Sequence, residues 1–436
     1  MNANNQIVST VIKDYKESQR AFLPKIVSIP LAQEDGKTFF SLVEKGDVVK
    51  EGEIIAQSES SSGKKSFIHS SVPGTVVAVE PCFTPEGKQD FSIKIKFGGS
   101  FSYLGKKSEE KPLALFSSSE IIEKLSKHGV INSFNTASPQ NLGNQIETLV
   151  SGKKKPEHLI VRLFDEDPYR VTDFLLSKLY IQNVLEGAKI VAKAINAKKI
   201  ILAVDQKVME DEVFSKTDFS DFQLLEMNIR RYPCGTPREI ISAFARASQK
   251  KEIGFTLNKY DLFIDSTTAL SAFKAVSLNI PCVDGFVHFF GNCLYASCLL
   301  EVRVGTTLRD IVNQIGGFIK EPAHIIINGR LCGICVQSLD IPITKYVKSV
   351  EFISKKRITD DQVYSCVNCG NCRFVCPVKL SPDILYNNTV NFKLLDKAFA
   401  ASAIACLECG LCNTVCPARL PLSQTIKVLK NNLKGE

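Results

Sequence analysis

Two cysteine runs near the end of the chain constrain its fold more than any other part of the sequence. The first run extends from Cys366 to Pro377, and the second extends from Cys406 to Pro417. Both have the spacing C-x2-C-x2-C-x3-C-P, with which thiolates in a short segment bind the irons of [4Fe–4S] clusters. The duplicated motif therefore predicts a segment that folds around two such clusters.

The same spacing predicts which thiolates share a cluster. In two-cluster ferredoxins, three cysteines of one run surround one cluster, and the cysteine before the proline reaches the other cluster. The ligands expected are, for cluster 1, Cys366, Cys369, Cys372 and Cys416, and for cluster 2, Cys406, Cys409, Cys412 and Cys376. Zinc is the weaker alternative because its sites typically use separate cysteine pairs or mixed Cys/His sets. A disulfide scaffold is also a weaker alternative, because such scaffolds are typical of small secreted chains.

Composition places the chain among globular proteins with an ample core. It has 436 residues, of which 44% are hydrophobic and 23% are charged. Residues 1–20 lack the apolar stretch of a secretory signal, and no apolar run approaches the roughly 18 residues of a membrane span. We therefore expect a reducing compartment, in which thiolates are kept for metal. The net charge of +8 is consistent with solubility or with docking to an acidic partner or membrane surface, and nothing indicates nucleic acid.

Short β-runs interrupted by glycine predict a barrel-sandwich domain over residues 25–100, after a polar tail over residues 1–24 that could be a short helix. The pattern resembles biotinyl and lipoyl carrier domains. A carrier lysine would be Lys64 or Lys65, but a structural barrel is favoured because these lysines lie in a loop rich in serine and glycine. Residues 101–116 are rich in small and charged residues and predict a linker.

Strand and helix patterns alternate over residues 117–278 and predict an α/β domain with a parallel sheet. Strands are expected at residues 158–164, 199–204, 223–227 and 261–265, and helices at residues 120–127, 174–196 and 237–249. Ser266 or Thr267 is expected to cap the helix that follows the last strand.

Two further domains complete the expected fold class, which is multidomain α/β plus β. Residues 279–354 alternate like a β-grasp (SLBB-like) domain, with a short helix opening near Thr307. Residues 355–436 predict a helical, ferredoxin-like domain for the two clusters. Apolar residues at helical spacing predict a terminal helix packed on that domain; they are Leu422, Ile426, Leu429 and Leu433.

In this order, the parts of the chain resemble the RnfC subunits of Rnf ion-translocating electron transport complexes. The resemblance covers almost the whole chain after residue 20 and is strongest in residues 46–56, 71–76, 366–380 and 406–422. Further similar segments are residues 231–235, 302–306, 315–317 and 340–345. The resemblance implies that the α/β domain is similar to the flavoprotein subunit of respiratory complex I, which binds FMN and accepts a hydride from NADH.

The chain differs from that family where a flavin would bind. The family has a glycine-rich loop of the type GxGGAGFP, whereas the matching residues 129–139 keep only Gly129, Phe134 and Pro139. Side chains in place of the other glycines would prevent close approach of phosphate and flavin ring. The acidic segment of the family corresponds to residues 164–169, with Asp173 nearby, which could equally be a loop that caps a helix at Thr172 or Asp173. We therefore expect FMN and NADH binding to be weakened or lost.

The resemblance implies a peripheral subunit on the cytoplasmic face of the cell membrane that relays electrons through its clusters. Its partners would be the membrane subunits of an Rnf-type complex and a soluble donor or acceptor, such as NADH or a ferredoxin- or flavodoxin-like protein. Such a relay requires no catalytic side chain, and NADH dehydrogenase activity of the chain itself is not expected. Two alternatives remain, a stand-alone NADH-dependent reductase similar to cobalamin reductases and a non-catalytic assembly subunit.

The other cysteines and the histidines carry weaker signals. The cysteines outside the two runs include the pair Cys332 and Cys335 and are expected to be small buried residues, because no second pair accompanies this one. The histidines occur singly, without a partner at ligand spacing, and a structural role is expected for each of them.

Overall fold

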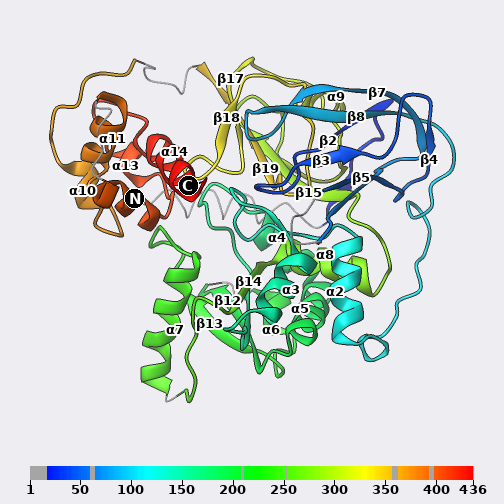
Figure 1. The fold of residues 1–436 in the computed structure, drawn as a ribbon, viewed down its shortest axis with the longest axis horizontal. Helices are drawn as coiled ribbons and strands as arrows, with labels where there is room; N and C mark the ends of the chain where they lie inside the picture. Colours follow the sequence, from blue (N-terminus) through cyan, green and yellow to red (C-terminus); the bar gives the residue numbers. More distant parts are fainter. Residues whose placement is uncertain are drawn as a thin grey trace. The chain divides into compact units, whose positions relative to one another are not determined.

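The computed structural model of the chain describes residues 17–58, 64–207, 211–251, 253–355, 362–391 and 397–435 (Figure 1). The chain forms two compact units. The first unit comprises Met1–Gly329 and Gly333–Ser354, and the second comprises Arg330–Cys332 and Lys355–Glu436. The first unit contains three sheet-based parts, and the second contains the helices around the cysteine runs.

The first part of unit 1 is a barrel sandwich of two antiparallel sheets. Its strands are β2 (Ile26–Pro30), β3 (Phe39–Ser41), β4 (Val48–Val49), β5 (Ile54–Ser58), β6 (Phe67–His69), β7 (Gly74–Phe83) and β8 (Gln89–Phe97). One sheet has the order β2-β8-β7-β4 and the other the order β3-β5-β6. Alternate residues face the interior, so that Ile93 and Ile95 are fully buried while Lys96 is exposed.

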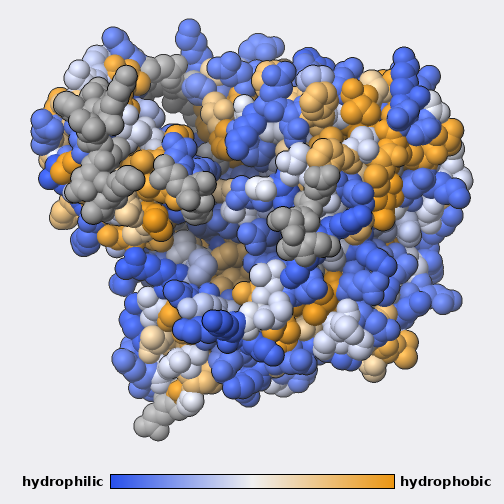
Figure 2. All heavy atoms as spheres, in the orientation of Figure 1, coloured by the Kyte–Doolittle hydropathy of each residue, from blue (hydrophilic) through white to orange (hydrophobic). Residues whose placement is uncertain are grey.

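The barrel also carries apolar residues on its outside. Figure 2 shows apolar side chains gathered over the barrel strands, whose exposed apolar residues include Phe40, Val48, Ile54, Phe83 and Phe91. The expected carrier lysines follow residues 59–63, which lie outside the described residues. The Lys64 ammonium donates a hydrogen bond to the Thr148 hydroxyl at 3.1 Å. Nothing in this contact indicates a carrier function.

The second part of unit 1 is a parallel sheet with the strand order β13-β12-β11-β14. The strands are β11 (His158–Arg162), β12 (Lys199–Asp205), β13 (Gln223–Met227) and β14 (Leu262–Asp265). The other elements are η1 (Leu113–Leu115), α2 (Ser118–Lys127), β9 (Ile131–Asn132), β10 (Gln140–Asn141), α3 (Leu142–Ser151), α4 (Thr172–Leu179), α5 (Ile181–Ile195), α6 (Glu212–Ser215), α7 (Pro237–Lys251) and α8 (Ser266–Val276). The expected parallel sheet is therefore present.

Helices cover both faces of this sheet (Figure 1). Leu159 and Val161 of β11 pack with α2, α5 and α8 on one face, whereas Ile160 between them packs with α7 on the other. This packing on both faces is why the three central residues of the strand, 159–161, are all apolar. The helix expected over residues 174–196 is wrong in one respect, since Tyr180 leaves helical geometry (φ −129°) and separates α4 from α5.

The third part of unit 1 is a sheet with the order β1-β16-β15-β19-β17-β18. Its elements are β1 (Gln19–Arg20), β15 (Asp284–Gly291), β16 (Cys298–Arg303), α9 (Leu308–Gln314), β17 (Pro322–Ile327), β18 (Ile334–Val336) and β19 (Ser349–Ser354). Thr307 caps α9 by accepting a hydrogen bond from the Asp310 amide, as the sequence indicated. Residues 19–20 of the expected tail form strand β1, paired with β16, while residues 1–16 lie outside the described residues.

Unit 2 is built from short helices. These are α10 (Asn371–Val375), α11 (Pro382–Asn391), α12 (Lys397–Ala401), η4 (Ser402–Ala405), α13 (Leu411–Thr414) and α14 (Leu422–Gly435). Leu385 of α11 and Ile426 and Leu429 of α14 form a small core together with Cys376. The terminal helix predicted from the spacing of leucines is therefore present. Among the described residues, no helix has the length and apolar character needed to cross a membrane.

A buried charge network ties the third part of unit 1 to the parallel sheet. The Lys348 ammonium donates to Asp173 at 2.6 Å and to Asp265 at 2.5 Å, and all three side chains are at most 1% exposed. Burial and the neighbouring Asp265 carboxylate raise the pKa of Asp173 to about 6. Burial also opposes ionisation of Asp265, but Lys348 and Arg162 outweigh it and lower the pKa of Asp265 to about 2. The network therefore depends on the Lys348 cation.

These contacts correct the expected helix caps. Asp265 itself caps α8 by accepting from the Thr268 amide at 2.8 Å, so neither Ser266 nor Thr267 is the cap. Helix α4 begins after Val171, which provides no side-chain cap. The Asp165 carboxylate accepts from the Phe174 amide at 3.2 Å instead. Asp173 points to Lys348 and to Thr267, which donates to it at 2.7 Å.

Replacing Gly187 by alanine should destabilise unit 1. A methyl group at Gly187 of α5 would lie 1.9 Å from the carbonyl oxygen of Ala269 on α8, so the two helices would have to move apart. Overpacking of this kind costs about 1–3 kcal/mol. We expect Gly187→Ala to lower the thermal unfolding midpoint, measured by circular dichroism. The matched control is Gly254→Ala, where the added methyl group meets no atom within 4 Å. Equal midpoints for the two variants would contradict the close helix contact.

Replacing Lys348 by methionine should destabilise the protein in a pH-dependent way. The substitution leaves two buried carboxylates without their cation, which costs about 3–5 kcal/mol. Without Lys348 the pKa values of both carboxyl groups in the folded protein should rise, so the folded state binds protons more tightly than the unfolded state. Stability should therefore recover as pH falls from 8 to 5.

The measurement for Lys348→Met is the thermal unfolding midpoint at several pH values, with Lys216→Met as the control. Lys216 pairs with Glu212 at an exposed site, where an ion pair contributes at most about 1 kcal/mol. A Lys348→Met loss that is small, or that grows as pH falls, would disprove the proposed dependence on the cation.

Candidate iron–sulfur centres and the closed end of the parallel sheet

The eight cysteines of the two runs line two separate cavities of unit 2. The first cavity is lined by Cys366, Cys369, Cys372 and Cys416. The second is lined by Cys376, Cys406, Cys409 and Cys412. Each cavity thus receives three thiols from one run and the fourth from the other run. This is the grouping that the spacing predicts for two crossed clusters.

Local backbone geometry places the thiols in these walls. Gly370 and Gly410 have φ values of +73° and +70° and begin helices α10 and α13, on which Cys372 and Cys412 lie. Only glycine adopts this conformation at little cost. Backbone amides also point at sulfur, since Leu380 donates to the Cys376 sulfur at 3.3 Å and Leu420 to the Cys416 sulfur at 3.5 Å.

The chemistry of the cavities suits iron–sulfur clusters. Apart from their thiols, the described walls are mainly apolar, with residues such as Val367, Leu420 and Ile426. Burial raises the pKa of Cys409 to about 11 and that of Cys412 to about 12. Such thiols ionise when iron supplies positive charge nearby, and amides that donate to sulfur stabilise the thiolate. Four thiols in an apolar wall are the ligand set that a [4Fe–4S] cluster requires.

A single metal ion suits the described residues less well than a cluster. No group of three or more His, Cys, Asp or Glu side chains in the described part of the chain is arranged to hold one metal ion. A cluster keeps its four thiolates farther apart than one ion does, because they bind different corners of the iron–sulfide cube.

The parallel sheet of unit 1 has a topological switch point between β11 and β14. Strands β12 and β13 lie on one side of β11, and β14 lies on the other. In open α/β sheets, ligands bind in the crevice outside the carboxyl ends of the strands at this point. The strand ends that border it are Arg162 and Asp265, which are paired in register.

The chain's own side chains fill this crevice. Arg162 is fully buried and donates to the carbonyl oxygens of Gly235 at 2.8 Å and Phe134 at 2.9 Å. Its guanidinium carbon lies 4.0 Å from the centre of the Phe134 ring. Asp265 binds Lys348, as described above, and accepts hydrogen bonds from Ser133. The charges of Arg162 and Lys348 therefore balance those of two carboxylates, Asp173 and Asp265. These groups lie at the place where a doubly wound sheet usually binds its ligand.

The loop that corresponds to the expected flavin loop packs on this network. Ser133 and Phe134 belong to it, and both are buried. At its start, Gly129 accepts a hydrogen bond from the Lys345 ammonium at 2.9 Å. A phosphate or a flavin ring at this place would have to displace Arg162 and Phe134. The residues present do not fit FMN there.

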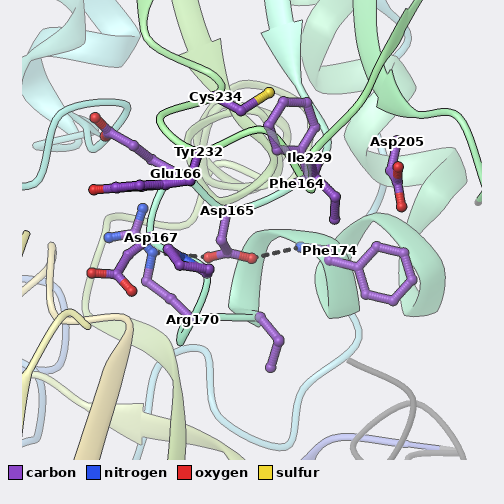
Figure 3. Close-up of a pocket in the computed structure, with 12 residues that line it drawn as sticks. Phe164, Asp165, Glu166, Asp167, Arg170, Phe174, Asp205, Ile229, Tyr232 and Cys234 are labelled. Atoms are coloured by element: carbon purple, nitrogen blue, oxygen red, sulfur yellow. Dashed lines mark hydrogen bonds and ion pairs between the residues drawn. The ribbon is translucent and has the colours of Figure 1, made fainter. Parts of the chain in front are cut away.

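An open pocket lies beside the filled crevice, at the ends of β11 and β12 (Figure 3). The carboxylates that line it are Asp165, Glu166, Asp167 and Asp205. Arg170 also lines the pocket, but it pairs with Asp165 at 2.9 Å. A wall with this excess of negative charge repels the phosphates of nucleotides. The acidic segment from Asp165 onward thus acts as a capping and ion-pairing loop in the folded chain.

The remaining cysteines only partly follow the expectation of burial. Cys234 and Cys293 are buried, whereas Cys82, Cys282, Cys298 and Cys332 are half-buried and Cys335 is exposed. The Cys335 sulfur lies 3.4 Å from Nδ1 of His324, a contact that the spacing did not indicate because the two residues are on neighbouring strands. Among the other histidines, His69, His158 and His288 are buried, and His128 is half-buried.

Two segments of the chain match known protein families. Residues 12–100 match the family described as the RnfC barrel sandwich hybrid domain. Residues 365–420 match the 4Fe-4S dicluster domain. These matches cover the barrel sandwich of unit 1 and the cysteine runs of unit 2.

Whole proteins similar to this chain include the C subunits of two ion-translocating complexes. The C subunit of the proton-translocating ferredoxin:NAD(+) oxidoreductase complex of Clostridium ljungdahlii is 24% identical, with 85% of this chain and 80% of that protein covered. The C subunit of the Na(+)-translocating ferredoxin:NAD(+) oxidoreductase complex of Acetobacterium woodii is also 24% identical, with 82% and 80% covered.

A solved structure of an NAD+-reducing [NiFe]-hydrogenase in the H2-reduced state aligns with a TM-score of 0.46 and 12% identity over 73% of this chain. The chain spans 61% of that hydrogenase chain. Over most of its length the chain is thus similar to the C subunits of ion-translocating ferredoxin:NAD(+) oxidoreductase complexes, and its amino-terminal part matches the RnfC barrel sandwich hybrid domain.

Proposed function

We propose that this RnfC-like chain is the electron-transfer subunit of a membrane-associated, ion-translocating oxidoreductase complex of the Rnf type. The observation that carries the proposal is the pair of cavities in unit 2, each lined by four cysteines drawn from both runs. The names of the C subunits to which the chain is similar place those proteins in ion-translocating complexes. Similarity to both relatives over most of the chain supports the same role here.

The proposal assigns the eight cysteines as ligands of two [4Fe–4S] clusters, which supply one-electron chemistry when bound. The cluster in the first cavity would be held by Cys366, Cys369, Cys372 and Cys416. The cluster in the second cavity would be held by Cys406, Cys409, Cys412 and Cys376. The amides of Leu380 and Leu420, which donate to the sulfurs of Cys376 and Cys416, would stabilise negative charge on these ligands. No proton transfer by a side chain is needed for such a relay.

The proposal gives the parallel sheet no flavin or NADH chemistry of its own. Support comes from Arg162 and Lys348, which fill the crevice at the switch point, and from the acidic pocket beside it. Electrons would then reach the clusters from a bound protein, such as a ferredoxin- or flavodoxin-like donor. The chain would be peripheral, on the cytoplasmic face of the membrane, in contact with the other subunits of the complex.

Purification from membranes tests the assignment to a complex. We expect the chain to co-purify with integral membrane subunits of an Rnf-type complex and its clusters to be reduced by a soluble electron-carrier protein. Isolation as a free enzyme that oxidises NADH would favour the reductase alternative. Clusters that no physiological donor reduces would favour an assembly subunit. Either result would contradict the proposed relay.

Loss of Cys376 should remove the cluster of the other run. Its thiol lines the second cavity with Cys406, Cys409 and Cys412, so Cys376→Ala should lose the same cluster as Cys409→Ala. Cys369→Ala is the matched control and should lose the other cluster. Iron analysis should show about half of the iron for each variant, and electron paramagnetic resonance should show which signal remains. A Cys376→Ala spectrum that matches Cys369→Ala would disprove crossed ligation.

The purified chain with intact clusters should contain no stoichiometric FMN. A flavin at the switch point would have to displace the buried Arg162 side chain and its hydrogen bonds to Phe134 and Gly235. The measurement is flavin fluorescence after denaturation of protein reconstituted with excess FMN, with NADH oxidation by the loaded protein as a second readout. One FMN per chain, together with NADH oxidation, would disprove the proposed closure.

A further inference from the structure

The two cysteine runs are repeats whose charged neighbours differ. Equivalent cysteines, such as Cys366 and Cys406, are separated by 40 positions. With the same separation, Asp383 corresponds to Ser423 and Arg373 corresponds to Asn413. For the charged residues of the second repeat, Glu408 corresponds to Asn368 of the first repeat, and Lys430 corresponds to Val390. Each repeat therefore has an ion pair where the other has uncharged residues.

The first cavity has a carboxylate in its wall. Asp383 lines this cavity and accepts hydrogen bonds from Arg373, with Nε 2.8 Å from Oδ1 and 3.0 Å from Oδ2. The Asp383 side chain is only 5% exposed, whereas that of Arg373 is 48% exposed. Water screens the exposed guanidinium more than the buried carboxylate, so the negative charge dominates inside the cavity.

The second cavity has uncharged residues in the equivalent positions. Ser423 lines this cavity, and its amide donates to the Asn413 side chain at 2.9 Å. None of the residues described in its wall carries a charged side chain apart from the cysteine ligands.

A cation lies next to one ligand of the second cavity. The Lys430 ammonium donates to the carbonyl oxygen of Cys406 at 2.9 Å and to Glu408 at 2.8 Å. Lys427 adds a second ammonium 3.6 Å from Glu408, so this group carries one more cation than carboxylate.

We infer that Asp383 and Lys430 make the two cluster sites unequal, with the lower reduction potential at the Cys366 site and the higher potential at the Cys406 site. This inference rests on the proposed function and deepens it. An added electron is disfavoured by a buried carboxylate and favoured by a nearby ammonium, and net charge is one of the factors that set cluster potentials. The favourable direction of electron transfer is then from the Cys366 site to the Cys406 site, without any bond change or proton transfer.

The test is a potentiometric titration of the full chain, followed by electron paramagnetic resonance. Asp383→Asn should shift the lower of the two midpoint potentials upward and leave the higher one in place. Ser423→Asp, which puts the carboxylate in the equivalent position of the other repeat, should shift the higher midpoint downward. Lys430→Met should also lower the higher midpoint.

The matched control is Arg373→Gln, which breaks the same ion pair as Asp383→Asn but keeps the carboxylate. If charge sets the potential, the two variants must shift the lower midpoint in opposite directions. Shifts in the same direction would mean that loosening of the ion pair is the cause, and would overturn the inference. A shift of the higher midpoint by Asp383→Asn would also overturn it.

Measurement of iron content distinguishes a failure of this inference from a failure of the proposed function. A full chain that cannot be loaded with two clusters would refute both. Two clusters whose potentials do not respond to Asp383, Ser423 or Lys430 would refute the inequality and leave the relay intact. Should Asp383→Asn fail to fold, two other shifts still decide the question: Arg373→Gln should lower the lower midpoint, and Ser423→Asp should lower the higher midpoint.

Discussion

The Lys348 ammonium, held between Asp173 and Asp265, is the interaction on which unit 1 most depends. Lys348 precedes strand β19, Asp173 lies on α4, and Asp265 ends β14, so one cation joins the six-stranded sheet to the parallel sheet. A buried cation between two carboxylates is costly to desolvate, and removal of one partner leaves charge without compensation. The same contacts lie at the switch point, where the carboxyl ends of β11 and β14 meet.

Unit 2 depends on a different constraint, the exchange of cysteines between repeats. Because Cys376 lines the cavity of the second run and Cys416 that of the first, neither cavity is complete without both runs. The cores between them are small and contain cysteine side chains themselves. Metal binding in such a site contributes directly to folding. Any difference in potential between the two proposed clusters would therefore come from the residues around the cavities, since each cavity has four cysteines.

Local spacing predicted much of the structure, because the motifs that define it are short. The parallel strands from His158 to Asp265 and the terminal helix follow from periodicity within one segment. The spacing of the two runs also predicted which cysteines line the same cavity, while their role as cluster ligands stays a prediction. The helix break at Tyr180 and the Asp265 cap were missed because tertiary contacts decide them. Arg162 and Lys348 were missed for a stronger reason. In a sequence a buried cation looks like any surface cation, and its partners lie far away along the chain.

The parallel sheet and the cysteine cavities both show that the fold of this chain does not by itself define its chemistry. The parallel sheet keeps a switch-point topology that often holds a ligand, but a fold does not by itself imply that function. Arg162, Lys348 and their carboxylates serve stability there. In unit 2, Asp383 and Lys430 occupy positions where the opposite repeat has uncharged residues, so their charges distinguish two cavities that are each lined by four cysteines. If these cavities hold the proposed clusters, a difference in potential between them would give electron transfer a direction.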